Sequence, residues 1–81
     1  MNVTREATAY VRRRGGTAYV WLDGAQLVHA RTKPPREEID FRDFESGRIR
    51  LRVDRKLTPP ELWTLVLRHF PLPRLGVDWN S

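Results

Sequence analysis

Apolar and basic residues alternate strictly along residues 48–54, Arg-Ile-Arg-Leu-Arg-Val-Asp. Because successive side chains of a β-strand point to opposite faces, this pattern predicts a half-buried strand with an apolar inner face and a cationic outer face. The inner residues are Ile49, Leu51 and Val53, and the outer residues are Arg48, Arg50 and Arg52. We expect the other elements to pack over the apolar face of this strand.

Three further strands are predicted at residues 7–14, 17–22 and 25–31, where β-branched and aromatic residues are frequent. Gly15-Gly16 and Asp23-Gly24 separate them, and both dipeptides are typical of two-residue hairpin turns. Residues 7–31 are therefore expected to form a three-stranded meander. In that register one face collects Val11, Val20, Leu22 and Leu27.

A hairpin is predicted over residues 39–54, after a charged linker at 32–38 whose two prolines exclude a central strand. Glu45-Ser46-Gly47 fits a three-residue turn with glycine in the left-handed position. That turn pairs Phe41 with Leu51 on the inner face. It also sets Arg42 opposite Arg50, a like-charge pair that is unfavourable unless it is relieved.

One helix is predicted at residues 58–70. Thr58 and Glu61 are spaced as in a capping box, and an apolar stripe follows them. Pro71 ends the helix, because the residue before a proline is disfavoured in helical geometry. Residues 71–81 are expected to be an extended tail that is apolar enough to pack, and residues 1–6 a loose one.

These elements predict a single small α+β domain over residues 1–81. Its expected fold is a five-stranded antiparallel sheet or partly open barrel, made of the meander and the hairpin, followed by one C-terminal helix. A domain of this size is only marginally stable alone, which favours a homo-oligomer or a bound partner.

The chain has a formal net charge of +5 and a pI of about 10.7. A basic domain attracts phosphate backbones, acidic proteins and membrane surfaces. Cysteine is absent, which excludes disulfides and thiolate metal sites. No apolar run is long enough to span a membrane, and no secretory signal is evident, so we expect a cytoplasmic protein without a membrane partner.

Aromatic and arginine side chains are predicted to share the outer faces of the meander and the hairpin. Single-strand binders stack bases on such aromatics while arginines hold the phosphates. The candidate nucleic-acid-binding residues are Tyr10, Arg12, Arg14, Tyr19, Trp21, Arg42, Arg48, Arg50 and Arg52. Two alternatives stay open: the face is buried by barrel closure or by the C-terminal tail, or it is a protein or dimer interface.

No residue pattern indicates catalysis or a metal site. His29 and His69 are the two histidines, and neither belongs to a motif with metal-ligand spacing. We therefore expect a non-catalytic binding module without a cofactor. Nucleic acid, preferably single-stranded, is the expected partner, and the alternative is protein–protein interaction or self-assembly through the same face or the Trp79 tail.

Overall fold

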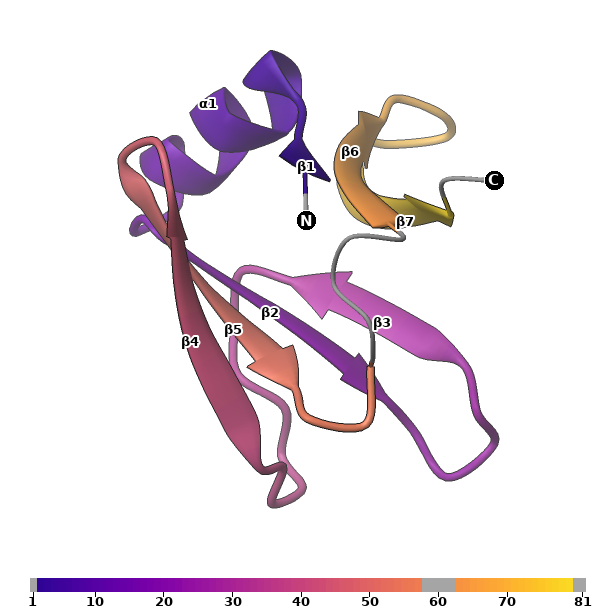
Figure 1. Ribbon diagram of the computed structural model, residues 1–81. Coiled ribbons are helices and arrows are strands. Elements are labelled where there is room, and N and C mark those ends of the chain that lie inside the picture. The colour runs from indigo at the N-terminus through magenta and orange to yellow at the C-terminus, as the bar shows by residue number, and fades with distance from the viewer. Residues whose placement is uncertain (1, 58–62, 80–81) are drawn as a thin grey trace.

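The structure is a computed structural model that describes residues 2–57 and 63–79. Within these ranges the chain forms one helix and seven strands, and the strands make up two sheets (Figure 1). The elements are β1 (Asn2–Val3), α1 (Arg5–Arg13), β2 (Thr17–Leu22), β3 (Val28–Arg31), β4 (Phe41–Ser46), β5 (Ile49–Asp54), β6 (Trp63–Arg68) and β7 (Arg74–Trp79).

The first predicted strand is wrong, because residues 5–13 form the helix α1. Thr4 caps this helix, since its hydroxyl accepts a hydrogen bond from the Ala7 amide at 3.2 Å. Gly15 and Gly16 have φ values of +108° and +85°, and the Gly16 amide donates to the Val11 carbonyl. The glycine pair therefore ends a helix instead of turning a hairpin.

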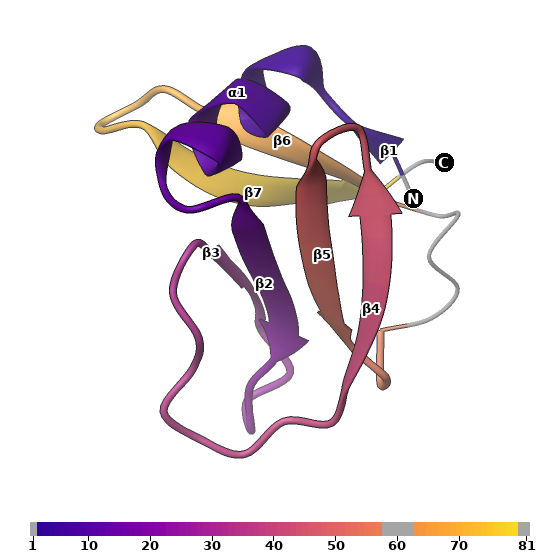
Figure 2. The same ribbon diagram turned by 90° about the vertical axis from the view of Figure 1, so that its left-hand side faces the viewer.

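The larger sheet has the strand order β3-β2-β5-β4, so β5, which corresponds to the strand predicted at residues 48–54, is an interior strand. β2 and β5 run parallel, and Ala18 is paired with Leu51. Since β3 and β4 are the two edges of this sheet, the segment between them must cross it. Figure 2 shows this segment passing from β3 to β4. The expected antiparallel sheet is thus a mixed one.

The hairpin of β4 and β5 is present, but its register differs from the predicted one. Ser46 is paired with Ile49 across Gly47 and Arg48, so Phe44, not Phe41, lies opposite Leu51. This register places Glu45 opposite Arg50 and Asp43 opposite Arg52. The unfavourable pairing of two arginines is therefore replaced by pairs of opposite charge.

The β2–β3 pair also has a longer loop than predicted. Leu22 is paired with Val28, and the Asp23 carboxylate accepts hydrogen bonds from the Ala25 and Leu27 amides. These bonds hold a wide turn in place of the two-residue turn. Leu27, expected inside, is consequently 62% exposed.

The predicted C-terminal helix is wrong as well, because residues 63–68 form the strand β6. Its proposed capping residues, Thr58 and Glu61, lie outside the described residues. β6 pairs antiparallel with β7 and parallel with β1, which gives a three-stranded sheet of order β1-β6-β7. The expected extended tail is in part the strand β7, which buries Leu75.

The hydrophobic core is shared by the two sheets and α1 (Figure 1). In β5 the side chains that enter this core are Ile49, Leu51 and Val53, as the alternation along the strand predicts. The most deeply buried apolar side chains include Ala7, Val11, Val20, Leu51, Val53, Trp63 and Leu65. The fold is therefore α+β with an N-terminal helix and two mixed sheets.

Asp54 is the one buried charged residue in the described part of the chain, with 1% of its surface exposed. Its two carboxylate oxygens accept hydrogen bonds from the Leu22 amide at 3.1 Å and the Lys56 amide at 3.0 Å. The side chain thereby joins the end of β2 to the turn that follows β5.

Candidate nucleic-acid interface

The outer face of the larger sheet carries four of the predicted site residues, Tyr19, Trp21, Arg50 and Arg52, with Arg50 at the start of β5, next to the β4–β5 turn. Tyr19 is paired with Arg52 in the parallel register, and Trp21 follows on the same face of β2. Trp21, however, is only 6% exposed, and its ring stacks on His29 at a centroid distance of 5.3 Å. A buried indole cannot serve as a stacking platform for a base.

The surroundings of Tyr19 and Arg52 are acidic. Arg52 is bound to Asp43 at 2.9 Å and lies over the Phe41 ring, which contacts Tyr19 edge-on. A hollow of about 740 Å³ separates these residues from the linker. Glu37 and Glu38 of the linker line it, together with Asp40, which precedes β4. This concentration of carboxylates disfavours phosphate binding on the outer sheet face.

Tyr10, Arg14 and Arg42 do not belong to that face. Tyr10 lies on α1 and Arg14 at its C-terminal end, where the Arg14 guanidinium lies 4.4 Å from the Tyr10 ring centroid. Arg42 is exposed on the edge strand β4, opposite Val53. The prediction for Tyr10 and Arg14 is wrong because residues 7–14 do not form a strand, and that for Arg42 because the hairpin register differs from the predicted one.

Arg12 lies on α1, Arg48 in the β4–β5 turn and Arg50 at the start of β5, and these elements are neighbours in the structure. The Arg50 amide donates to the Gly16 carbonyl at 2.8 Å, and a side chain added at Gly47 would contact Thr8 of α1. The helix adds two exposed arginines that were not predicted. We call this set the arginine surface: Arg5, Arg12, Arg13, Arg48 and Arg50.

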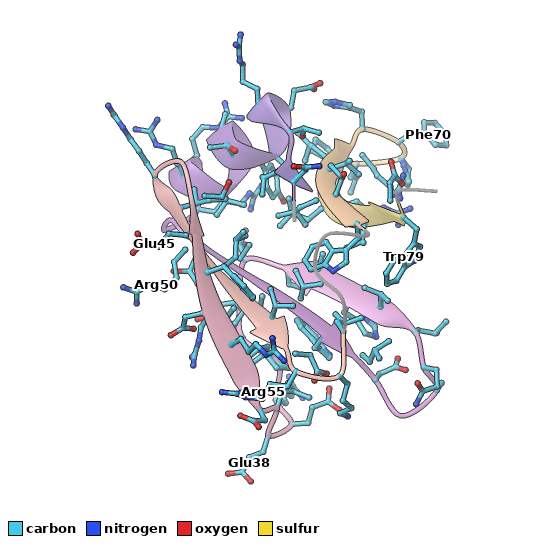
Figure 3. All side chains as sticks on the ribbon, in the orientation of Figure 1. Glu38, Glu45, Arg50, Arg55, Phe70 and Trp79 are labelled. Atoms are coloured by element: carbon cyan, nitrogen blue, oxygen red, sulfur yellow. The ribbon has the colours of Figure 1, made fainter. Side chains whose placement is uncertain are left out.

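The charges of the arginine surface are largely uncompensated. Within residues 2–57 and 63–79, none of its five guanidinium groups forms an ion pair, although Glu45 lies opposite Arg50 across the hairpin. Figure 3 shows the Glu45 and Arg50 side chains pointing away from the sheet. By contrast, the side chains of Arg52, Arg55 and Arg68 are each bound to an aspartate.

Helical periodicity could have revealed the two additional arginines. Ala7 and Val11 are four residues apart on the buried side of α1, and Arg5, Arg12 and Arg13 are exposed. Read with a period of 3.6 residues, residues 5–13 form a helix with one apolar face and a basic face opposite. The Thr4 cap gives the same indication.

The two histidines bind different carboxylates. The Nε2 atom of His29 is 2.7 Å from Asp23 Oδ2, and that of His69 is 2.7 Å from Glu6 Oε2. The hydrogen bond from His29, followed by those from the Leu27 and Ala25 amides, lowers the pKa of the Asp23 carboxyl. Across the described ranges no three histidine or acidic side chains are grouped as metal ligands would be.

An apolar tip lies at the loop between β6 and β7. Phe70 is 85% exposed and Leu72 is 72% exposed. In Figure 3 the Phe70 side chain points away from the body of the molecule. Trp79, at the end of β7, is also exposed. These side chains are available for contact with another molecule.

In the part of the chain that the structure describes, no helix is long and apolar enough to cross a membrane. The chain matches no family model, no curated protein and no solved structure.

Proposed function

We propose that this protein is a non-catalytic nucleic-acid-binding module that holds phosphates with the arginine surface. The carrying observation is that α1 and the neighbouring β4–β5 hairpin expose five arginines that form no ion pair within the described residues. Arginine presents a planar fork of donors that matches phosphate oxygens. The overall charge of +5 acts in the same direction.

The burial of Trp21 changes the expected mode of binding. Phosphate contacts carry the affinity in this proposal, and base stacking on Trp21 has no part in it. Binding through phosphates alone depends weakly on sequence and steeply on salt. The binding assay therefore compares the affinity for single-stranded oligonucleotides with the affinity for duplex ones.

The test is fluorescence anisotropy of a labelled oligonucleotide at several salt concentrations. The double variant Arg12→Ala/Arg48→Ala should lower the slope of log affinity against log salt by roughly 1.4–1.8, about 0.7–0.9 for each lost phosphate contact. The matched control is Arg36→Ala/Lys56→Ala, which removes the same charge from two exposed residues outside the arginine surface. The control should lose much less affinity.

Two results would reject the proposal. Absence of binding by the wild type at low salt would exclude nucleic acid as the partner. An equal loss in both double variants would show that only net charge matters and that the arginine surface is no site.

Protein–protein interaction is the second candidate, and the apolar tip favours it. Two large apolar side chains exposed on one loop, Phe70 and Leu72, are suited to insertion into a partner's pocket. The test is light scattering after size-exclusion chromatography, with and without nuclease treatment of the lysate. Phe70→Ser should reduce the mass of any nuclease-resistant assembly, whereas Leu27→Ser, at an exposed site on another loop, should not.

A further inference from the structure

A groove runs between the free edges of the two sheets. β3 is an edge of the larger sheet, β7 is an edge of the smaller one, and the two strands lie side by side without being paired. The groove consists of two adjoining hollows of about 310 and 190 Å³, which share Arg31 and Arg74 in their walls. We call it the β3–β7 groove.

Cationic side chains from three segments meet in the β3–β7 groove. Arg31 comes from β3, Lys33 from the linker and Arg74 from β7. In the described parts of the chain these three make no hydrogen bond or ion pair through their side chains, and no carboxylate lines either hollow. Their positive charges repel one another unless an anion lies between them.

Two other basic residues of the larger hollow are already engaged. His29 is bound to Asp23, and Arg68 donates to Asp78 at 2.7 Å. Arg68 lies across Gly76, where any added Cβ would collide with its guanidinium group. Arg68 is therefore a fixed wall of the groove, and the available charge is concentrated at Arg31, Lys33 and Arg74.

The number of charges indicates which anion suits the groove. A carboxylate carries one negative charge, whereas a phosphomonoester carries about −1.5 to −2 near neutral pH and offers three acceptor oxygens. Three cations with several donors each match the phosphomonoester better. Tyr10 also lines the smaller hollow, and the nearby Arg14 guanidinium adds positive potential.

We propose that the β3–β7 groove binds a phosphomonoester group, held by Arg31, Lys33 and Arg74. Two sources share this chemistry: the terminal phosphate of a nucleic-acid strand and a free mononucleotide. The groove is lined by none of the five residues of the arginine surface. The inference therefore goes beyond the proposed function, and each can fail alone.

The direct test follows amide chemical shifts of the intact protein during titration with inorganic phosphate, adenosine 5′-monophosphate and adenosine. The two phosphates should shift the amides of residues 30–33 and 74–76, and adenosine should not. In Arg31→Ala/Arg74→Ala the affinity for the monophosphate should fall by tenfold or more, because charge-assisted contacts are lost. The control Arg36→Ala/Lys56→Ala, with the same change in charge, should retain its affinity.

Oligonucleotides with and without a 5′-phosphate separate the two sources. Tighter binding of the phosphorylated strand, lost in Arg31→Ala/Arg74→Ala, identifies a strand end as the ligand. Equal binding of both strands, together with binding of the monophosphate, identifies the mononucleotide. No shift with either phosphate, or an equal shift with adenosine, overturns the inference. Binding of the unphosphorylated strand, which depends on Arg12 and Arg48, reports on the arginine surface separately.

Discussion

Replacing Asp54 should be among the most destabilising single changes to a polar residue in this domain. Its buried carboxylate satisfies two backbone amides, those of Leu22 and Lys56. Asp54→Ala removes both acceptors, and each donor left without a partner costs about 1–3 kcal/mol. The expected loss is about 2–6 kcal/mol, against about 4–12 kcal/mol of total stability for a chain of this length.

Asp54→Asn is a milder change than Asp54→Ala, because the asparagine side chain keeps one acceptor oxygen. One of the two backbone donors must then lose its partner, so the loss should be about 1–3 kcal/mol. Asp43→Ala is the matched control, since this exposed carboxylate is bound only to Arg52 at the surface. Its loss should stay below about 1 kcal/mol.

Urea unfolding followed by tryptophan fluorescence measures all three variants. With a slope of about 1 kcal/mol per molar urea, a loss of 2 kcal/mol lowers the midpoint by about 2 M. A midpoint for Asp54→Ala within about 0.5 M of the wild type would refute the assignment of Asp54 as a structural acceptor. So would an Asp43→Ala midpoint that falls equally far.

Three further predictions use the same unfolding assay. Leu51→Ala should lower the free energy of unfolding by about 2–5 kcal/mol because the Leu51 side chain is fully buried. Arg50→Ala should lower it by less than about 1 kcal/mol because Arg50 is exposed. A larger loss for Arg50→Ala than for Leu51→Ala would show that the inner and outer faces of β5 are assigned the wrong way round. Thr4→Ala should cost about 0.5–2 kcal/mol through loss of the helix cap, and an unchanged midpoint would contradict that role. The pKa of Asp23 is lowered in the folded state, so as the pH falls this carboxyl is protonated first in the unfolded chain. The stability advantage of the wild type over Asp23→Ala should therefore be complete above the ordinary aspartate pKa of about 3.9 and shrink below it. An advantage that grows on acidification would refute this linkage.

The strand β5 was predictable because alternation of apolar and polar residues with a period of two indicates a half-buried strand. β2 has the predicted bounds of residues 17–22, and Leu51 and Val53 are buried as expected. The pairing register was not predictable, because it depends on the length of the turn. In both hairpins the observed loop differs from the predicted one, and the residue opposite each position changes accordingly.

The helix and the last strands were misassigned for two different reasons. Gly15-Gly16 suits a hairpin turn and a helix end equally, so the decision depended on Thr4 and the spacing of Ala7 and Val11. Residues 63–68 are almost continuously apolar, a pattern that fits a buried helix or a buried strand. Pairing with β1 and β7 decides between them, and that is tertiary information.

The candidate site was predictable only in its residue types. The arginines at positions 12, 48 and 50 were identified, but the correct surface depends on the packing of α1 against the β4–β5 turn. Trp21 lies on the outer face as predicted, yet it is buried there. The β3–β7 groove has no counterpart in the sequence, because it is formed by three segments from different parts of the chain.

The pairing of β1 with β6 determines how late in synthesis this domain can fold. Asn2 is paired with Thr64, and α1 packs against β6. The β4–β5 hairpin is local and can close in about 1–10 μs, whereas the ends of the chain must meet across nearly its whole length. On the ribosome, α1 can therefore pack against β2 and β5 first, and its contact with β6 forms only after β6 has emerged. Local structure is therefore expected to form first, and the packing of α1 against the smaller sheet to complete the fold.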